Sequence, residues 1–493
     1  MKYVLGIDFG GGSSKATLLS ETGEAAAVCG YEYPTRYPKP GYVEQDPADW
    51  YRATAENIRG VIEKSGIDPK DIVMIAPDAA THTAVLLDQN GEVIRPAVYW
   101  TDTRSIDQCA YLKSRFGEEI FEKMLHLPDT IWTLPQLMWL KENEPALFAK
   151  TKTVLFAKDY VRYRLTGVLC TDFIEAEGSM LFDYTSMDWS KRLCEMGNIP
   201  FELLPELRKP TDIVGGVTPQ AARETGLVAG TPVICGTTDT VMEVFAAGAV
   251  KPGEMTAKLA TAGRICVVTD RPYAGKHFIN YSHVAEGLWY PGTATKSCAS
   301  SYRWYRDTFG ETYAELDKAA EEVPAGCEGL LFHPYLNGEL TPYADPLLCG
   351  SFTGLRAGHT KAHFSRAVLE GVALSLLDCK KELERAGIPI SSAATIIGGG
   401  SHSSLWRQIT ADVLGMELRQ TENSDSSFGS AMLAGVAAGV FRDLSDALVR
   451  CSKTLSVTTP DPARTREYAA LYERYRQIHD ALAPVYHACG EQS

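Results

Sequence analysis

The chain has 493 residues, of which 45% are hydrophobic, and its formal net charge is −14 at pH 7. This length exceeds what one ordinary hydrophobic core covers, whereas two domains of about 240 residues would fit. Because an acidic chain is repelled by phosphate backbones and by anionic lipid, neither nucleic acid nor a membrane surface is expected as a partner.

The chain enters a predicted strand at residues 3–8, with no charged and apolar leader segment before it. No segment approaches the run of about 18 apolar residues that a membrane-spanning helix needs. The 12 cysteines are scattered and form no CxxC pair, which is typical of reduced thiols. We therefore expect a cytoplasmic protein.

A glycine-rich turn follows this first strand, with the sequence GIDFGGGSSK at residues 6–15. Glycines let the backbone turn tightly and let its amides approach a phosphate. Asp8, at the end of the strand, supplies carboxylate oxygens, the ligands that Mg²⁺ prefers. A glycine-rich turn is also common in ordinary hairpins, which is the more frequent explanation for such a motif taken alone.

Strand and helix signals alternate through the remainder of the first half. Asp46 and Pro47 are a typical helix cap and first helical residue, and they predict a helix to about residue 64. Further strands are expected at residues 72–76 and 83–88, and further helices at 105–116, 135–143 and 158–165. This alternation predicts an α/β domain.

Asp239 follows an apolar strand, in the segment ICGTTDT at residues 234–240. A carboxylate at this position can accept a proton from a bound hydroxyl group. An acid directly after a strand is, however, more often the cap of the next helix. The assignment of Asp239 therefore depends on the elements around it.

A similar order of predicted strands and turns begins again after Pro252-Gly253. Strands at residues 255–259 and 264–269 flank a turn in which Thr261 offers a hydroxyl and an amide to a phosphate. The two halves thus begin alike, which indicates a structural duplication with a hinge near residues 246–253.

The second glycine-rich element is Gly398-Gly399-Gly400, which follows a buried strand at residues 394–397 and precedes a helix at 403–414. It is neither a Walker A loop nor a GxGxxG motif, so it predicts a nucleotide site of another design. Close packing between strand and helix is the alternative. Long helices are expected at residues 360–386 and 462–482.

Five stretches carry a family resemblance. The most specific is GSFTGL at residues 350–355, followed after seven residues by HFSRAVLE at 363–370; the others are PYLNGELTP at 334–342, EQDP at 44–47, KDY at 158–160 and WTDTR at 100–104. With the four turns described above, they resemble the FGGY carbohydrate kinases, most closely the xylulokinase-like members. The resemblance covers nearly the whole chain.

The resemblance implies an α/β fold of two actin-like (ribonuclease H-like) domains that flank a deep catalytic cleft. Residues 1–247 would form a mainly sugar-binding domain, and residues 248–493 a mainly nucleotide-binding domain with C-terminal helices. The implied activity is ATP-dependent phosphorylation of a sugar hydroxyl, with a ketopentose such as xylulose as the acceptor. ATP and Mg²⁺ are the implied cofactors, and a homodimer is a family-level expectation.

The resemblance also assigns residues, because the family's functional positions map onto this chain. Asp239 would be the catalytic base. The sugar would be contacted by Thr81, His82, Asp239 and Thr240, and Mg²⁺ would be held near Asp8 and Asp239. The nucleotide positions are Gly10, Gly11, Gly12, Ser13, Lys15, Thr261, Gly399, Gly400 and Ser404. For His82 the ordinary alternative is a satisfied strand histidine.

Several positions depart from the family pattern. Gly11, Gly12 and Ala262 stand where hydroxyl residues are usual, although backbone amides can still serve the phosphates. Thr81 stands for Met and Thr240 for Asn in the sugar pocket, so other acceptors stay open: ribulose, a deoxy-sugar, glycerol or erythritol. Two other classes also stay open, an actin-like or chaperone-like ATPase and a non-catalytic protein that binds sugar or nucleotide.

Overall fold

The computed structural model describes residues 1–490, and the chain forms two compact units. Unit 1 comprises residues 1–250, 281–286 and 423–452, and unit 2 comprises the other described residues. Two segments that follow position 248 therefore pack with the N-terminal half of the chain. The last residues of the expected C-terminal domain, 491–493, lie outside the described part.

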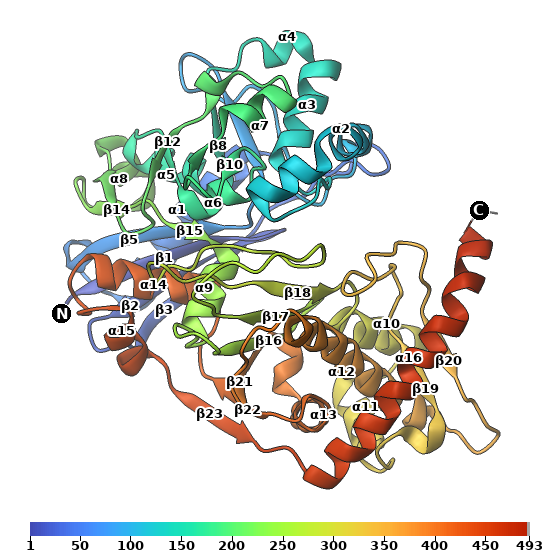
Figure 1. The fold of residues 1–493 in the computed structure, drawn as a ribbon. Coiled ribbons are helices and arrows are strands. Elements are labelled where there is room, and N and C mark those ends of the chain that lie inside the picture. The colour runs from blue at the N-terminus through green and yellow to red at the C-terminus, as the bar shows by residue number, and fades with distance from the viewer. Residues whose placement is uncertain (491–493) are drawn as a thin grey trace. The chain divides into compact units, whose positions relative to one another are not determined.

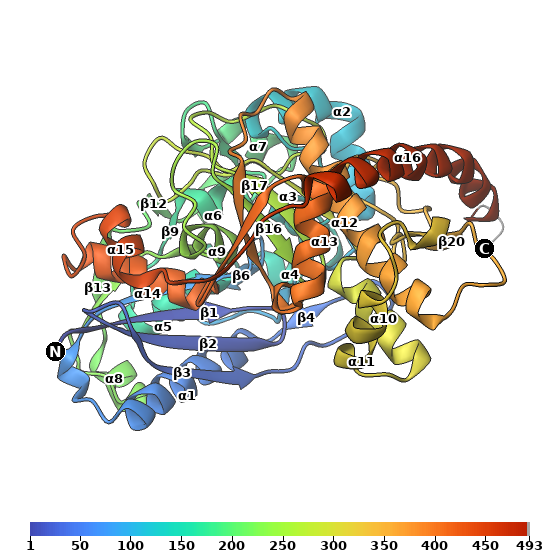
Figure 2. The ribbon, with the colours of Figure 1, turned by 90° about the horizontal axis from the view of Figure 1, so that it is seen from below.

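Unit 1 is built on a mixed sheet with the order β13-β14-β5-β1-β2-β3, and β15 also pairs with β5. β1 and β2 form an antiparallel hairpin, whereas β5 and β14 run parallel to β1. Figure 2 shows β1, β2 and β3 side by side. The strands are β1 (Tyr3–Phe9), β2 (Ser13–Ser20), β3 (Ala25–Glu32), β5 (Ile72–Ala79), β13 (Ile213–Gly216), β14 (Pro232–Ile234) and β15 (Thr237–Thr238).

Helices cover this sheet and bury its apolar side chains. α1 contacts β2 and β3, while α14 lies along β1 and β5 (Figure 1). The larger helices are α1 (Pro47–Ser65), α2 (Ile106–Met124), α3 (Thr133–Asn143), α5 (Ala157–Thr166), α9 (Asp239–Ala246), α14 (Ser426–Ala437) and α15 (Leu444–Cys451). The shorter ones are α4 (Pro145–Phe148), α6 (Phe173–Glu177), α7 (Lys191–Met196) and α8 (Pro219–Thr225).

Four small two-stranded sheets complete unit 1. They pair β4 (Glu44–Gln45) with β7 (Ala97–Val98), β6 (Ala84–Leu87) with β8 (Thr153–Phe156), β9 (Cys170–Asp172) with β12 (Glu206–Arg208), and β10 (Phe182–Asp183) with β11 (Asp188–Trp189). β9 runs directly into α6, and that junction matters for the site described below.

Unit 2 contains a second sheet with the order β18-β17-β16-β21-β22-β23. Its strands are β16 (Met255–Leu259), β17 (Gly263–Val267), β18 (Gly292–Thr295), β21 (Ala393–Ile397), β22 (Glu417–Thr421) and β23 (Thr454–Thr458). β19 (Leu331–His333) and β20 (Ser351–Thr353) form a separate pair. The helices are α10 (Ala299–Phe309), α11 (Tyr313–Glu321), α12 (Lys361–Arg385), α13 (Ser404–Leu414) and α16 (Pro462–Gly490).

The two sheets repeat one topology. Each begins with an antiparallel hairpin, and a third strand extends each hairpin antiparallel. On the other side, the first strand of each hairpin pairs in parallel with a later strand, which is followed by one more parallel and one antiparallel strand. The structural duplication predicted from the sequence is therefore confirmed.

Most predicted elements are found within a few residues of their expected bounds. α1 begins as predicted: Asp46 accepts a hydrogen bond from the amide of Ala48 at 3.1 Å, and Pro47 is the first helical residue. α2 and α16 run further than predicted, to Met124 and Gly490, and α16 continues through Pro484. Within residues 1–490, no helix is long and apolar enough to cross a membrane.

Candidate active site

Asp239 is the first residue of α9 and follows β15. The N-cap position is held by Thr238, and no side chain caps the helix there. The ordinary explanation for Asp239, a helix cap, is therefore wrong. Asp239 is half-buried, and its Oδ1 accepts a hydrogen bond from the Thr240 hydroxyl at 3.1 Å.

The neighbouring strand brings Thr81 and His82 to the same edge of the sheet. β15 pairs in parallel with β5, and Thr238 lies opposite Ala79, the last residue of β5. Asp239 therefore begins where β15 ends, and Thr81 and His82 follow the end of β5 in the same way. Thr81 is half-buried and His82 is buried. The carboxyl ends of parallel strands are where α/β folds commonly place ligands.

Asp8 and Asp78 face each other across β1 and β5. Burial, and next the negative charge of Asp239, raises the pKa of Asp8 to about 7. Burial also raises the pKa of Asp78, with Asp8 as the second cause. Ser430 of α14 donates a hydrogen bond to Asp78. Two carboxyl groups this close cannot both ionise readily, so we infer that the fully buried Asp78 holds a proton beside Asp8.

Asp78 was not among the residues singled out from the sequence. The available signal was an acid inside the otherwise apolar segment IVMIAPDA, residues 72–79. A carboxyl group there is costly to bury unless it is neutral or paired. This makes an acid within a core strand a candidate for a functional site.

The first glycine turn connects β1 and β2 and is held by its carbonyl groups. The Gly10 amide donates to the Ser13 carbonyl at 2.9 Å, and the Tyr33 hydroxyl donates to the Gly10 carbonyl at 2.6 Å. Gln45 Nε2 donates to the Gly11 carbonyl at 2.8 Å. These hydrogen bonds are made to the backbone carbonyls of the turn. They hold the turn in place and leave the residues at its tip uncovered.

The tip of this turn is open. Gly11, Gly12 and Ser13 are exposed. Lys15 lies in β2, where its Nζ is 3.2 Å from Asp425 Oδ2, and both side chains are partly exposed. An exposed pair of this kind contributes little to stability, so Lys15 is free in energetic terms to exchange its partner for a phosphate.

His82 has an unusual backbone. Its φ is +74°, so it lies in a turn and not in a strand, and this left-handed conformation is costly for a residue with a Cβ. The Glu175 carboxylate accepts from the His82 amide at 3.0 Å, and the Thr133 hydroxyl donates to its carbonyl at 2.9 Å. The ring contacts the Tyr281 hydroxyl through Nε2 and lies 4.6 Å, centroid to centroid, from Trp132.

Gly178, at the end of α6, makes room for this histidine. A Cβ at position 178 would lie 2.4 Å from His82 Cδ2. Any side chain there would displace the ring. The glycine therefore allows α6 and the His82 turn to approach each other closely.

Tyr281 belongs to a short segment, residues 281–286, that packs with unit 1 although the chain on both sides belongs to unit 2. Glu177 anchors this segment: the Ser282 amide donates to Oε2 at 2.7 Å and the Ser282 hydroxyl to Oε1 at 2.6 Å. Burial raises the pKa of Glu177 to about 8. α6 thus holds His82 through one acid and the Tyr281 segment through another.

This raised pKa predicts how stability depends on pH. Because the folded protein holds the Glu177 proton more tightly than the unfolded chain, Glu177 contributes stability that is fully present below about pH 4.5 and is lost as the pH rises to about 8. Gln resembles the protonated acid and can donate to the Ser282 hydroxyl while accepting from its amide. Between about pH 5.5 and 8.5, we expect Glu177→Gln to gain at least about 1 kcal/mol relative to the native chain, because a tenfold change in proton affinity is worth about 1.4 kcal/mol.

Chemical unfolding at the two pH values measures this difference. Glu119→Gln is the matched control, because Glu119 is only partly buried and its pKa is lowered by Arg192. That variant should gain no stability as the pH rises. Equal pH dependence in the native chain and in Glu177→Gln would contradict the assignment.

The remaining predicted nucleotide residues lie together in unit 2. Thr261 is in the turn between β16 and β17, and Gly399 and Gly400 follow β21 in a 3₁₀ turn. β16 pairs in parallel with β21, with Lys258 opposite Ile397. The threonine turn and the glycine turn are therefore neighbours at one edge of the second sheet.

Ser404 is the first residue of α13, whose N-cap is Ser403. A basic residue that the sequence did not single out, Arg303 of α10, donates to the Thr261 hydroxyl at 3.1 Å. Arg303 is exposed. A guanidinium beside the threonine turn supplies positive charge where this acidic protein would need it to bind an anion.

The chemistry of the Asp8 site fits a hard divalent cation. Asp8 Oδ1 and Asp78 Oδ1 are buried and accept no hydrogen bond from the described residues. No group of three His, Cys, Asp or Glu side chains within residues 1–488 is arranged to hold a metal ion. Mg²⁺ usually keeps several waters and binds proteins through one or two carboxylates together with substrate phosphates, so a site with few carboxylates is compatible with this ion.

Comparison with known proteins identifies the class. The family description "FGGY family of carbohydrate kinases" matches the chain twice, its N-terminal domain over residues 3–246 and its C-terminal domain over residues 233–438. The chain therefore belongs to the FGGY family and is a carbohydrate kinase that transfers phosphate from ATP to a sugar.

Individual relatives share the whole length of the chain. The xylulose kinase of Bacillus subtilis is 34% identical over 486 residues, which cover 97% of each chain. The crystal structure of xylulose kinase from Rhodospirillum rubrum is 30% identical, with a TM-score of 0.91, over 99% of this chain and 100% of that one. Gluconate kinase from Lactobacillus acidophilus is 26% identical, with a TM-score of 0.92, over 100% of both. These similarities confirm the expected fold of two actin-like domains.

Proposed function

We propose that this kinase phosphorylates a hydroxyl of a ketopentose such as xylulose and that Asp239 is its catalytic base. The observation that carries the proposal is the placement of Asp239 and the Thr81-His82 turn at the carboxyl ends of two paired parallel strands. The names of the Bacillus subtilis and Rhodospirillum rubrum relatives support the choice of xylulose.

Asp239 performs the proton transfer in this proposal. Phosphoryl transfer proceeds through a loose transition state, and the acceptor hydroxyl becomes acidic only late in the reaction. The base must therefore accept a hydrogen bond from the hydroxyl, orient it in line with the γ-phosphorus and take the proton as the new bond forms. Thr240 restrains the Asp239 carboxylate through its own hydrogen bond.

The sugar is bound by Thr81, His82 and Thr240 beside the base. The backbone contacts around His82 keep its ring in place before the sugar arrives, which lowers the entropy cost of binding. The domain containing residues 1–247 is accordingly proposed as mainly sugar-binding, and that of residues 248–493 as mainly nucleotide-binding.

The nucleotide is proposed to contact both glycine turns and the threonine turn. In unit 1, the exposed amides of the first turn and Lys15 would serve phosphate oxygens. In unit 2, Thr261 and Arg303 offer further hydrogen-bond donors to the nucleotide. Asp8 and Asp239 would hold Mg²⁺, which supplies charge compensation for the phosphates when bound. The proposed nucleotide residues are Gly10, Gly11, Gly12, Ser13, Lys15, Thr261, Gly399, Gly400 and Ser404.

A coupled ADP-release assay against a panel of acceptors tests the proposal. The panel comprises xylulose, ribulose, a deoxy-ketose, glycerol, erythritol and gluconate, the last because of the Lactobacillus acidophilus structure. We expect ADP release to depend on the acceptor and to be highest with xylulose. Water competes with the sugar as acceptor, so without sugar we expect ATP hydrolysis at about a hundredth of the kinase rate or less.

The other outcomes identify the alternatives. Highest turnover with another ketose, a polyol or gluconate would replace xylulose and keep the base. ADP release that is equally fast without any sugar would indicate an ATPase. Sugar or nucleotide binding without turnover would indicate a non-catalytic binding protein and would contradict the role of Asp239.

A further inference from the structure

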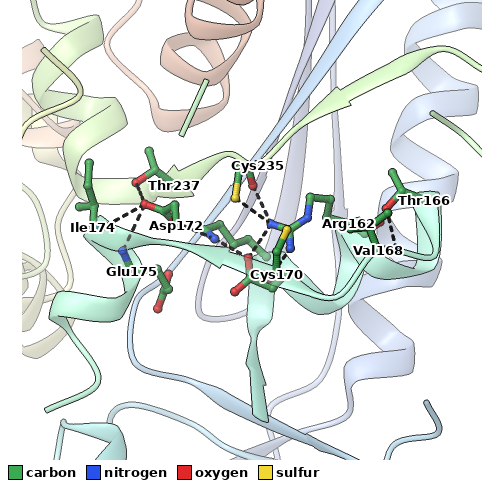
Figure 3. Close-up of polar contacts among 11 residues, drawn as sticks. Arg162, Thr166, Val168, Cys170, Asp172, Ile174, Glu175, Cys235 and Thr237 are labelled. Atoms are coloured by element: carbon green, nitrogen blue, oxygen red, sulfur yellow. Dashed lines mark hydrogen bonds and ion pairs between the residues drawn. The ribbon is translucent and has the colours of Figure 1, made fainter. Parts of the chain in front are cut away.

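Four fully buried charged side chains form an ion cluster in unit 1, and Figure 3 labels two of them, Arg162 and Asp172. We call Lys158, Asp159, Arg162 and Asp172 the buried ion cluster. Lys158 Nζ lies 2.8 Å from Asp172 Oδ2, Arg162 Nη1 lies 2.7 Å from Asp159 Oδ1, and Lys158 also pairs with Asp159. The free energy lost when charges are removed from water offsets much of the attraction between them. A buried ion cluster is therefore poor evidence of a purely stabilising role.

The cluster contacts the segment that leads to Asp239. Arg162 Nη1 donates to the Cys235 carbonyl at 2.8 Å, and the Thr237 hydroxyl donates to Asp172 Oδ1 at 2.9 Å. Between them, Gly236 has a φ of +73°, and a Cβ there would lie 1.9 Å from the Pro77 carbonyl oxygen. The backbone at residues 235–237, which leads to Asp239, is therefore held between the cluster and β5.

The same carboxylate also fixes the helix that holds His82. Asp172 is the N-cap of α6, and its Oδ1 accepts from the amides of Ile174 at 3.0 Å and Glu175 at 3.3 Å. Glu175 then accepts the His82 amide. One oxygen atom, Asp172 Oδ1, thus accepts hydrogen bonds from two segments. One is the strand that leads to the base Asp239, and the other is the first turn of α6, whose Glu175 holds His82.

We propose that Thr237 and Asp172 are positioning residues, which set the place of Asp239 relative to His82 through the hydrogen bond between the Thr237 hydroxyl and Asp172 Oδ1. The inference rests on the proposed roles of Asp239 and His82. Lys158 pairs with the other oxygen of this carboxylate, Asp172 Oδ2, at 2.8 Å, which holds the acceptor in place. A hydrogen bond to a charge-paired carboxylate is shorter and stronger than one between neutral groups. The directional hydrogen bond from the Thr237 hydroxyl to Asp172 therefore restrains the position of the end of β15 more closely than apolar packing does.

Thr237→Val tests this role, because valine keeps the shape of threonine and loses only the hydroxyl. We expect kcat with the preferred sugar to fall by about 10- to 100-fold, the scale of a small misplacement of a reacting group. KM for ATP should stay within about twofold, because the nucleotide contacts are elsewhere. Thr237→Ser restores the hydroxyl and should restore kcat.

Thr171→Val is the matched control. Thr171 is the neighbour of Asp172 in β9, is equally buried, and its hydroxyl makes no hydrogen bond within the described chain. Its kcat should stay within about twofold of the native value. If Thr237→Val and Thr171→Val lower kcat equally, or if Thr237→Ser does not recover, the positioning role is overturned.

Two further results are decisive. Should Thr237→Val fail to fold, Thr237→Ser and Thr237→Ala differ only by the hydroxyl oxygen, and equal kcat values for these two would overturn the inference. A native chain that releases no ADP with any acceptor would instead overturn the proposed function, and this inference with it. A native chain that is active while Thr237→Val is fully active overturns the inference alone.

Discussion

Asp239→Asn is expected to lower kcat by about 10³-fold while the affinity for ATP stays nearly unchanged. A positioned general base contributes about 10²- to 10⁴-fold to a rate, and asparagine keeps the size of the side chain but cannot accept the proton. Asp239 begins α9, and its helix carries no side-chain cap, so the substitution removes no capping bond. Single-turnover transfer and equilibrium ATP binding measure the two quantities separately.

Glu243→Gln is the control for this variant. Glu243 lies one turn further along α9 and, like Asp239, raises the pKa of Asp8 through its charge. The Glu243→Gln substitution therefore removes one negative charge near Asp8, as Asp239→Asn does, and leaves the proposed base in place. We expect it to retain kcat within about fivefold. Near-normal turnover in Asp239→Asn, or an equal loss in Glu243→Gln, would remove Asp239 from the role of base.

The local features of the site were predictable because strand ends carry a distinct sequence pattern. Asp8, Asp239 and the glycines at 398–400 each follow a short apolar run, and the structure places each at the carboxyl end of a strand. Predicting these strand ends needed only the change along the sequence from apolar residues to small and polar ones. The repeated order of these runs also revealed the duplication of the two sheets.

The contacts that support these strand ends were not predictable, because they join distant parts of the chain. Glu175 and His82 are 93 residues apart, and Ser430 and Asp78 are 352 apart. Nothing in the local sequence of an acid specifies such a partner. Asp172 carried no signal beyond that of an ordinary helix cap, a role that it also fills.

The return of two later segments to the first unit was not predictable for a related reason. Residues 281–286 and 423–452 follow the point at which the second unit begins, yet they pack with the first. α14, within the latter segment, covers β1 and β5 and supplies Ser430. A chain that returns to an earlier sheet shows no break in composition, so contiguous boundaries are the natural prediction from sequence and miss such segments.

His82→Ala is expected to raise the KM for the sugar by about 10- to 100-fold and to leave the KM for ATP nearly unchanged. A tenfold change in affinity is about 1.4 kcal/mol, and one or two hydrogen bonds to sugar hydroxyls supply an amount of this order. The ring is held by Tyr281 and packs against Trp132, so the protein has already met the cost of ordering it. Steady-state kinetics with each substrate varied in turn measure both constants.

His82→Gly separates the loss of the ring from a change in the backbone. His82 has a φ of +74°, which alanine adopts reluctantly and glycine freely. If the imidazole binds the sugar, the alanine and glycine variants should show the same raised sugar KM. If His82→Gly restores a normal KM, the histidine serves only to shape the turn that presents Thr81. An unchanged sugar KM in both variants would place His82 outside the sugar site, because removal of the ring alone would then have no effect on binding.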